Sequence, residues 1–288
     1  MNKSKLSIGT AQFIDNYGLK KNTKLNKNKI FEIYDFCNLN NINKLDTAVA
    51  YKDAEKVLGL LDLKDWEITT KLNKIPSNVS IKKYINTQIE LSLKNLNIDC
   101  LDNLLLHRPE QLFSPIGNQI YDALMNLIYQ KKISNFGYSV YSPQEFKDIY
   151  TRFKCNVCQI PFNIFDQRIL ESNFQNLIIK NKIKLQTRSI FLQGLLLLKK
   201  DEIHKYFYLW NKHFNKYFDF LKLNKTRALD LCVNFSYTSL FSDTIIVGIQ
   251  NLDQLKQILK VKNINIKNLS SLKNSDINLI DPTKWKIV

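Results

Sequence analysis

The sequence predicts a single (β/α)8 TIM barrel of the α/β class, with residues 1–288 forming one domain. A chain of 288 residues falls within the usual span of one such barrel. Short apolar runs alternate with longer segments of helical periodicity along the whole chain. With 7 Gly and 6 Pro, the chain has no Pro/Gly/Ser-rich stretch that could serve as a linker between two domains.

Eight short apolar runs are expected to be strands: 5–10, 43–48, 66–72, 101–107, 133–139, 156–162, 183–189 and 244–250. Five intervening segments carry apolar residues at i, i+3, i+4 and i+7 and are expected to be helices: 27–41, 79–97, 116–132, 142–153 and 226–237. Strand and helix in repeated alternation are typical of a closed parallel barrel. A doubly wound open sheet is the alternative, but its GxGxxG turn is missing from IGTAQFIDNYG, the turn after the first strand.

The formal net charge of +16 raises the question of nucleic acid as a partner. Only five of the 42 basic residues are Arg, and the Lys residues are scattered along the whole chain. Proteins that bind nucleic acid cluster basic side chains and favour Arg for bidentate contacts, so no nucleic-acid partner is expected.

Cysteine use and apolar runs indicate a cytoplasmic protein with no membrane partner. Five Cys form an odd set, and no secretory leader pattern opens the chain. The longest apolar run, 190–198, is too short for a bilayer and is interrupted by Gln193 and Gly194. Cys155 and Cys158 form a CxxC in the run KCNVCQIPF, which reads as a buried strand, without the second pair or nearby His that a zinc site needs, so no metal is expected.

Titratable side chains follow three consecutive predicted strands. Asp46 ends the second strand with Tyr51 five residues on, Lys71 ends the third, and His107 ends the fourth. Because the carboxyl ends of barrel strands meet on the face that holds active sites, we expect these four side chains to be catalytic.

The chemistry of the four side chains is complementary. A free Tyr has a pKa of about 10 and needs a neighbouring cation to act as an acid near neutrality, which Lys71 can provide. Asp46 can hold that ammonium in place, and His107 can donate a hydrogen bond to a substrate carbonyl oxygen. Together they can protonate an alkoxide while hydride is delivered to carbon.

The runs LDTAVAY (45–51), TTKL (69–72) and LLLHRP (104–109) resemble the three catalytic segments of the aldo-keto reductase superfamily, whose tetrad is Asp, Tyr, Lys and His in that order. IGTAQF, AEKVLG, GYS and VGIQNLDQLKQIL extend the resemblance over nearly the whole chain. TRSIFLQGLL and DPTKW are similar to a bacterial branch associated with polysaccharide or nucleotide-sugar pathways. The resemblance implies an NAD(P)H-dependent oxidoreductase that reduces an aldehyde or ketone, with Tyr51 as general acid.

The resemblance also implies a dinucleotide site. Gly9 and Thr10 would approach the nicotinamide, Ser139 and Gln159 would bind its carboxamide, and Arg188 and Ser189 would run under the cofactor. The adenosine phosphate end would be surrounded by four residues of the last strand and the turn after it: Gly248, Gln250, Asn251 and Gln254. NADP(H) is favoured over NAD(H), although Gln254 stands where well-studied members carry the Arg that binds the 2′-phosphate.

Two further departures from the family pattern concern the nicotinamide end. Val140 stands where many members have Asn, and Arg188 replaces a Tyr that stacks on the nicotinamide. The expected substrate is a small carbonyl compound of anionic or sugar-derived character. A dinucleotide-binding regulatory or assembly subunit with little turnover is the alternative function.

Overall fold

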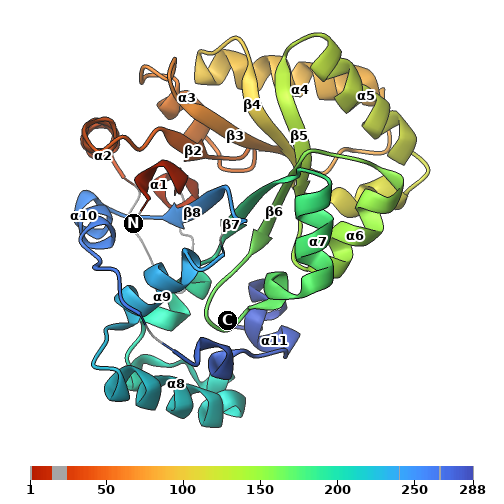
Figure 1. The fold of residues 1–288 in the computed structure, drawn as a ribbon. Helices are drawn as coiled ribbons and strands as arrows, with labels where there is room; N and C mark the ends of the chain where they lie inside the picture. Colours follow the sequence, from red (N-terminus) through yellow and green to blue (C-terminus); the bar gives the residue numbers. More distant parts are fainter. Residues whose placement is uncertain (1, 15–24, 240, 266, 288) are drawn as a thin grey trace.

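The computed structural model describes residues 2–14, 25–239, 241–265 and 267–287. Eight parallel strands close into one barrel in sequence order, with β1 pairing to β8 (Figure 1). The strands are β1 Leu6–Gly9, β2 Lys44–Asp46, β3 Glu67–Leu72, β4 Leu101–Leu106, β5 Ile133–Ser139, β6 Val157–Pro161, β7 Lys184–Arg188 and β8 Thr244–Gly248. The predicted (β/α)8 fold is confirmed, and each predicted strand is present.

Helices lie outside the barrel between the strands (Figure 1). The five predicted helices are α2 Lys27–Leu39, α4 Ile81–Leu96, α5 Gly117–Tyr129, α6 Pro143–Arg152 and α9 Ala228–Ser236. The structure adds α7 Ser172–Lys180, α8 Asn211–Leu223, α10 Leu252–Leu259 and the short α1 Ala11–Ile14, α3 Ala54–Leu58 and α11 Ile277–Ile280.

Local sequence explains where several helices begin. Ser142 caps α6 by accepting a hydrogen bond from the Glu145 backbone N–H, and Pro143 occupies the first helical position, where its missing N–H costs nothing. Asn251 caps α10 in the same way through the Gln254 N–H. These caps place the helix starts directly after the carboxyl ends of β5 and β8, which is the face where the site lies.

The barrel interior is more polar than the branched aliphatic filling usual for this fold. The Gln186 side chain of β7 donates to Thr69 Oγ1 of β3 at 3.0 Å, and Gln159 of β6 donates to Asp46 Oδ1 of β2 at 2.7 Å. Each of these hydrogen bonds joins strands that are four positions apart, so both cross the barrel. All four residues are buried. The catalytic face therefore stands on a hydrogen-bonded layer.

Gly137 of β5 lies where the backbones of β5 and β6 come very close. A Cβ atom built at this position would lie 1.9 Å from the Val157 carbonyl oxygen. Only glycine fits this contact without separating the two strands.

The C-terminal segment folds back onto α8 and the 3-10 helix Lys205–Trp210 that precedes it (Figure 1). The Phe207 and Trp285 rings meet edge to face with centroids 4.9 Å apart, and Trp210 Nε1 donates to Asp276 at 2.9 Å. Within the described ranges, no helix is long and apolar enough to cross a membrane.

Candidate active site

A pocket opens at the carboxyl ends of the strands and brings together all four predicted catalytic residues. It is lined by Gly9, Ala11, Gln12, Asp46, Tyr51, Lys71, His107, Ser139, Tyr141, Gln159, Arg188, Ser189, Ile190, Phe191, Gln193, Gly194, Ile246 and Gly248. Seven strands contribute to it, because parallel strands in a closed barrel present their carboxyl ends on one face.

Asp46 and Lys71 form a buried ion pair at the floor of the pocket. Lys71 Nζ donates to the two Asp46 carboxylate oxygens at 2.8 and 2.7 Å and to the Thr47 carbonyl at 2.9 Å. The side chains are only 2% and 7% exposed. Burial lowers the pKa of Lys71, and the attraction of Asp46 opposes this. The carboxylate thus holds a buried ammonium in one place.

Tyr51 lies in the turn between β2 and α3, directly beside the ion pair. Its ring centroid is 5.5 Å from Lys71 Nζ and 6.3 Å from the His107 ring, which stands almost perpendicular at 87°. The turn is closed by backbone hydrogen bonds from Tyr51 N to Ala48 O and from Ala54 N to Tyr51 O, both 2.9 Å. The phenol is therefore carried on an ordered turn.

Glu55, in α3, anchors this turn and was not identified from the sequence. Its buried carboxylate accepts hydrogen bonds from Thr70 Oγ1 at 2.7 Å and Ser92 Oγ at 3.1 Å. Burial raises the pKa of Glu55, and these hydrogen bonds oppose that rise. Because Thr70 precedes Lys71 in β3, Glu55 fixes the Tyr51 turn against the strand that carries the lysine. The sequence feature that could have indicated Glu55 is the segment AEKVLG, in which the Glu lies on the face of α3 that packs against the barrel.

His107 follows β4 and is held in the neutral form. Burial lowers its pKa to about 3, and the positive charges of Lys71, Arg188 and Arg108 act in the same direction. A neutral imidazole can donate one hydrogen bond to a carbonyl oxygen without giving up a proton at neutral pH.

Gln159 carries an unused acceptor at the pocket. Its Nε2 donates to Asp46 Oδ1 at 2.7 Å and to Gln186 Oε1 at 3.0 Å, so both contacts use the amide nitrogen and neither uses the oxygen. That Oε1 is buried without a hydrogen-bond partner in the described part of the chain. A buried acceptor of this kind fits a ligand that donates, such as a carboxamide NH2. Ser139, paired with Gln159 in the sheet, lines the same pocket.

Glycines open the pocket wall on the β1 and β8 side. Gly9 and Gly248 are paired in the sheet. A Cβ atom at Gly248 would come within 2.8 Å of Gln12 Oε1, and one at Gly9 within 3.2 Å of Ile246 Cγ2. Both positions let a ligand approach the backbone closely.

A second pocket continues from the first toward α9 and α10. It is lined by Gln12, Phe191, Gln193, Gly194, Leu197, Leu198, Arg227, Ala228, Leu229, Gly248, Gln250, Gln254, Gln257 and Ile258. Gln12, Phe191, Gln193, Gly194 and Gly248 line both pockets. The two form one elongated groove, which suits a dinucleotide with its two ends far apart.

Two predicted cofactor residues have other contacts. Among the residues that the structure describes, Thr10 and Asn251 are absent from the lining of both pockets. Thr10 Oγ1 donates to the Asp46 carbonyl at 3.1 Å, and Asn251 caps α10. Both position neighbours of the groove. The other eight predicted cofactor residues line one pocket or both: Gly9, Ser139, Gln159, Arg188, Ser189, Gly248, Gln250 and Gln254.

The segment after β7 spans both pockets in a strained conformation. Ser189, Leu192 and Gln193 have φ values of 61°, 47° and 57°, in the left-handed region, and Gly194 follows at 89°. Non-glycine residues adopt this region at a cost, so packing must hold it. Buried Leu192, Leu195 and Leu196 supply that packing.

Arg188 ends β7 and lies against Tyr141. Its guanidinium carbon is 4.5 Å from the Tyr141 ring centroid, Nη2 donates to Val140 O at 3.0 Å, and Nη1 donates to Ser189 Oγ at 3.3 Å. The side chain of Val140 is fully buried, so this residue contributes its carbonyl to Arg188 and presents no polar side chain.

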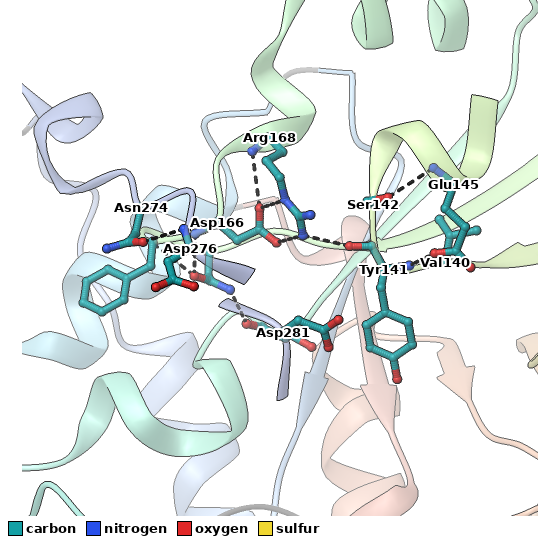
Figure 2. A network of polar contacts seen from close by, with 12 residues as sticks. Val140, Tyr141, Ser142, Glu145, Asp166, Arg168, Asn274, Asp276 and Asp281 are labelled. Atoms are coloured by element: carbon teal, nitrogen blue, oxygen red, sulfur yellow. Dashed lines mark hydrogen bonds and ion pairs between the residues drawn. The ribbon is translucent and has the colours of Figure 1, made fainter. Parts of the chain in front are cut away.

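Tyr141 is itself held from two sides (Figure 2). Arg168 donates to the Tyr141 carbonyl at 2.7 Å while making a bidentate pair with Asp166 at 2.8 and 2.7 Å. On the other side, the Tyr141 N–H donates to Glu145 Oε2 at 2.7 Å. Arg188 therefore rests on a fixed platform.

Comparison with known proteins gives the same assignment along the chain. Residues 5–278 match the profile of the Aldo/keto reductase family. Aflatoxin B1 aldehyde reductase member 2 of Rattus norvegicus is 32% identical over 128 residues, covering 42% of this chain and 34% of that protein. Oxidoreductase YdhF of Escherichia coli is 34% identical over 80 residues, covering 28% of this chain and 26% of that protein. The chain thus aligns with about a third of the length of these curated relatives or less.

A solved structure shares the fold. The holo form of an aldo-keto reductase from Bacillus halodurans has a TM-score of 0.71 and 20% identity, covering 98% of this chain and 95% of its own. The family profile extends over nearly the whole barrel, from β1 to α11. The chain belongs to the aldo/keto reductase family.

Proposed function

We propose that this chain reduces an aldehyde or ketone to an alcohol with NAD(P)H as hydride donor and Tyr51 as proton donor. The observation that carries the proposal is the meeting of Asp46, Tyr51, Lys71 and His107 in one pocket at the carboxyl ends of the strands. A purely regulatory module has no evident need for a phenol beside a buried ammonium.

The four side chains have distinct roles in the proposed reaction. Neutral His107 donates a hydrogen bond to the carbonyl oxygen and orients it beside Tyr51. The Tyr51 hydroxyl gives its proton to that oxygen, and the Lys71 charge stabilises the phenolate that remains. Asp46 keeps Lys71 charged and in place. The dinucleotide, when bound, supplies the hydride that forms the new C–H bond.

We propose that the dinucleotide occupies the groove, with its carboxamide at Ser139 and Gln159. The unpaired Gln159 Oε1 supports this placement, because it accepts what a carboxamide donates. The adenosine end would lie among Gln250, Gln254 and Arg227. NADP(H) would be preferred over NAD(H) through Arg227, and the preference would be modest because Asp230 already binds this guanidinium at 2.7 Å.

We further propose that the substrate is a small carbonyl compound that carries an anionic group, with a sugar-derived acid as one candidate. Arg188 supports this, since it lines the pocket and no carboxylate of the described residues lies within ion-pair distance of it. A guanidinium binds carboxylate and phosphate groups through paired hydrogen bonds. The chain would act as one domain in the cytoplasm, and the five free thiols of the structure suit that compartment.

The test combines a substrate screen with one hydroxyl deletion. Anionic and neutral carbonyl compounds are offered with NADPH or NADH, and loss of nicotinamide absorbance is followed. Tyr51→Phe should lower turnover on the best substrate by about 10²–10⁴-fold, typical of losing a general acid, with dinucleotide affinity unchanged. Tyr129→Phe, which removes the same hydroxyl from an 86% exposed side chain, is the matched control.

Full turnover by Tyr51→Phe would refute the assignment of the acid. A native chain that binds dinucleotide and turns over no carbonyl compound would instead favour the regulatory function.

A further inference from the structure

Arg188 places a fixed positive charge in the pocket that is proposed to receive the nicotinamide. The guanidinium stacks on Tyr141 and donates to Val140 O and Ser189 Oγ, which belong to the segments after β5 and β7. Tyr141 is clamped by Arg168 and Glu145 in turn (Figure 2). The charge therefore cannot swing out of the pocket without breaking a packed cluster.

The acids around Arg188 are already engaged by other groups. Asp46 binds Lys71, and Asp166 binds Arg168. The carboxylate of Glu145 accepts the Tyr141 N–H, beyond ion-pair distance of Arg188. With His107 neutral and Lys71 matched by Asp46, Arg188 is a charged group of the pocket lining that forms no ion pair with a carboxylate of the described residues, although the Glu145 carboxylate interacts with it electrostatically from a longer distance.

This charge reaches the catalytic groups. Burial is the main cause of the lowered pKa of Lys71 and His107, and the positive charge of Arg188, which lines the same pocket, acts in the same direction on both. A nicotinamide with its carboxamide at Ser139 and Gln159 would lie in the same field, because these two residues line the same pocket as Arg188.

The two redox forms of the cofactor differ in the charge of this ring. The nicotinamide ring is neutral in NAD(P)H and carries one positive charge in NAD(P)⁺, while the phosphates and the adenosine are the same in both. A guanidinium beside the ring repels only the oxidised form.

We infer that Arg188 makes this site bind the reduced dinucleotide in preference to the oxidised one, and so favours work in the direction of carbonyl reduction. This inference rests on the proposed cofactor site and adds to it a preferred direction of the reaction. Reduced cofactor is captured, and the oxidised product, once formed, is held more weakly and leaves. An anionic substrate would neutralise Arg188 during the hydride transfer itself, when positive charge develops on the ring.

The experiment measures the ratio of two dissociation constants by isothermal titration calorimetry, with no substrate and no turnover. NADPH and NADP⁺ are titrated separately into the native chain, Arg188→Gln, Arg188→Met and Arg188→Lys. Attraction to the phosphates cancels in the ratio, because both ligands carry the same phosphates. Circular dichroism confirms that each variant is folded.

The native chain should bind NADPH more tightly than NADP⁺, and Arg188→Gln and Arg188→Met should each reduce this ratio by about tenfold or more, since one unit charge at an effective dielectric near 20 contributes tenfold at about 12 Å and more at closer range. Arg188→Lys keeps the charge and should keep the ratio within about threefold of the native value.

An unchanged ratio in a neutral variant that still binds both forms would overturn the inference. So would an equal loss of the ratio in Arg188→Lys, because stacking would then matter and charge would not. Failure of the native chain to bind either form would refute the proposed cofactor site instead, so the two failures are distinguishable.

Discussion

Removing Lys71 tests whether its charge serves catalysis, stability or both. Lys71→Met keeps a long unbranched side chain and deletes the ammonium, which leaves Asp46 buried with 7% exposure and no cation. Breaking a buried ion pair from one side typically costs about 3–5 kcal/mol. Asp46 retains the hydrogen bond from Gln159 at 2.7 Å, so we expect a loss near the lower end, about 3 kcal/mol.

The double variant Lys71→Met, Asp46→Leu separates the two roles. It leaves no unpaired charge, and replacing a whole buried ion pair by apolar side chains is often neutral. Gln159 then keeps only Gln186 as acceptor, and the Thr47 carbonyl loses its donor, so a residual cost of about 1 kcal/mol is expected. The double variant should therefore be about 2 kcal/mol more stable than the single one.

Urea denaturation followed by Trp fluorescence measures these differences, and NADPH oxidation measures turnover on the same samples. Turnover should stay low in the double variant while stability returns, because the phenol still lacks its cation. A double variant as unstable as Lys71→Met, or one that regains turnover, would show that the ion pair does not act as reasoned.

Three further predictions follow from single contacts. Between pH 6.5 and about 3 the unfolded chain binds a proton at His107 that the folded chain does not, so the free energy of unfolding falls as the pH falls through this window, by about 2 kcal/mol at pH 5. His107→Gln should remove that part of the loss, as measured by urea titrations at pH 7.5 and 5. Gly137→Ala places a methyl group 1.9 Å from the Val157 carbonyl and should lower the free energy of unfolding by about 3 kcal/mol or more. Gly194→Ala meets no atom within 4 Å but has a φ of 89°, and should lower it by about 1 kcal/mol in the same assay. Asp230→Asn should free Arg227 and raise the ratio of NADH to NADPH dissociation constants by roughly threefold, and an unchanged ratio would remove Arg227 from the 2′-phosphate site.

Most strands were predictable because their residues are largely buried and read as a short apolar run between polar turns, although β2 (KLD) and β7 (KLQTR) are not apolar throughout. Helices α4, α5 and α6 were predictable because each has one strongly apolar face. The segment that became α7 has only Phe174 and Ile178 buried, and such a narrow apolar stripe gives a weak periodic signal. The short α1 and α3 were missed because helices of four or five residues show no periodicity.

The candidate site was predictable where a reactive side chain stands at the end of a predicted strand. Asp46, Lys71 and His107 fall there in order, and the closed barrel brings them together. Glu55 and Tyr141 could not be found in the same way, because one acts through a buried carboxylate on Thr70 and Ser92 and the other through backbone contacts to Arg168 and Glu145. Contacts of this kind depend on distances that no local pattern records.

The polar barrel interior holds in place the strand ends that carry the site. Gln159 ties Asp46 to the opposite side of the barrel, and Gln186 ties β7 to Thr69 of β3 in the layer below. Because Gln159, Gln186 and Thr69 are buried and hydrogen-bonded across the barrel, moving one strand end would leave buried donors and acceptors unpaired, which costs more than each hydrogen bond contributes when formed. An aliphatic interior would stabilise the barrel equally well but would tolerate small shifts of Asp46. The pKa of the Tyr51 phenol depends on its distance from the Lys71 ammonium, which Asp46 holds in place. The polar layer keeps Asp46 fixed and thereby keeps this distance constant.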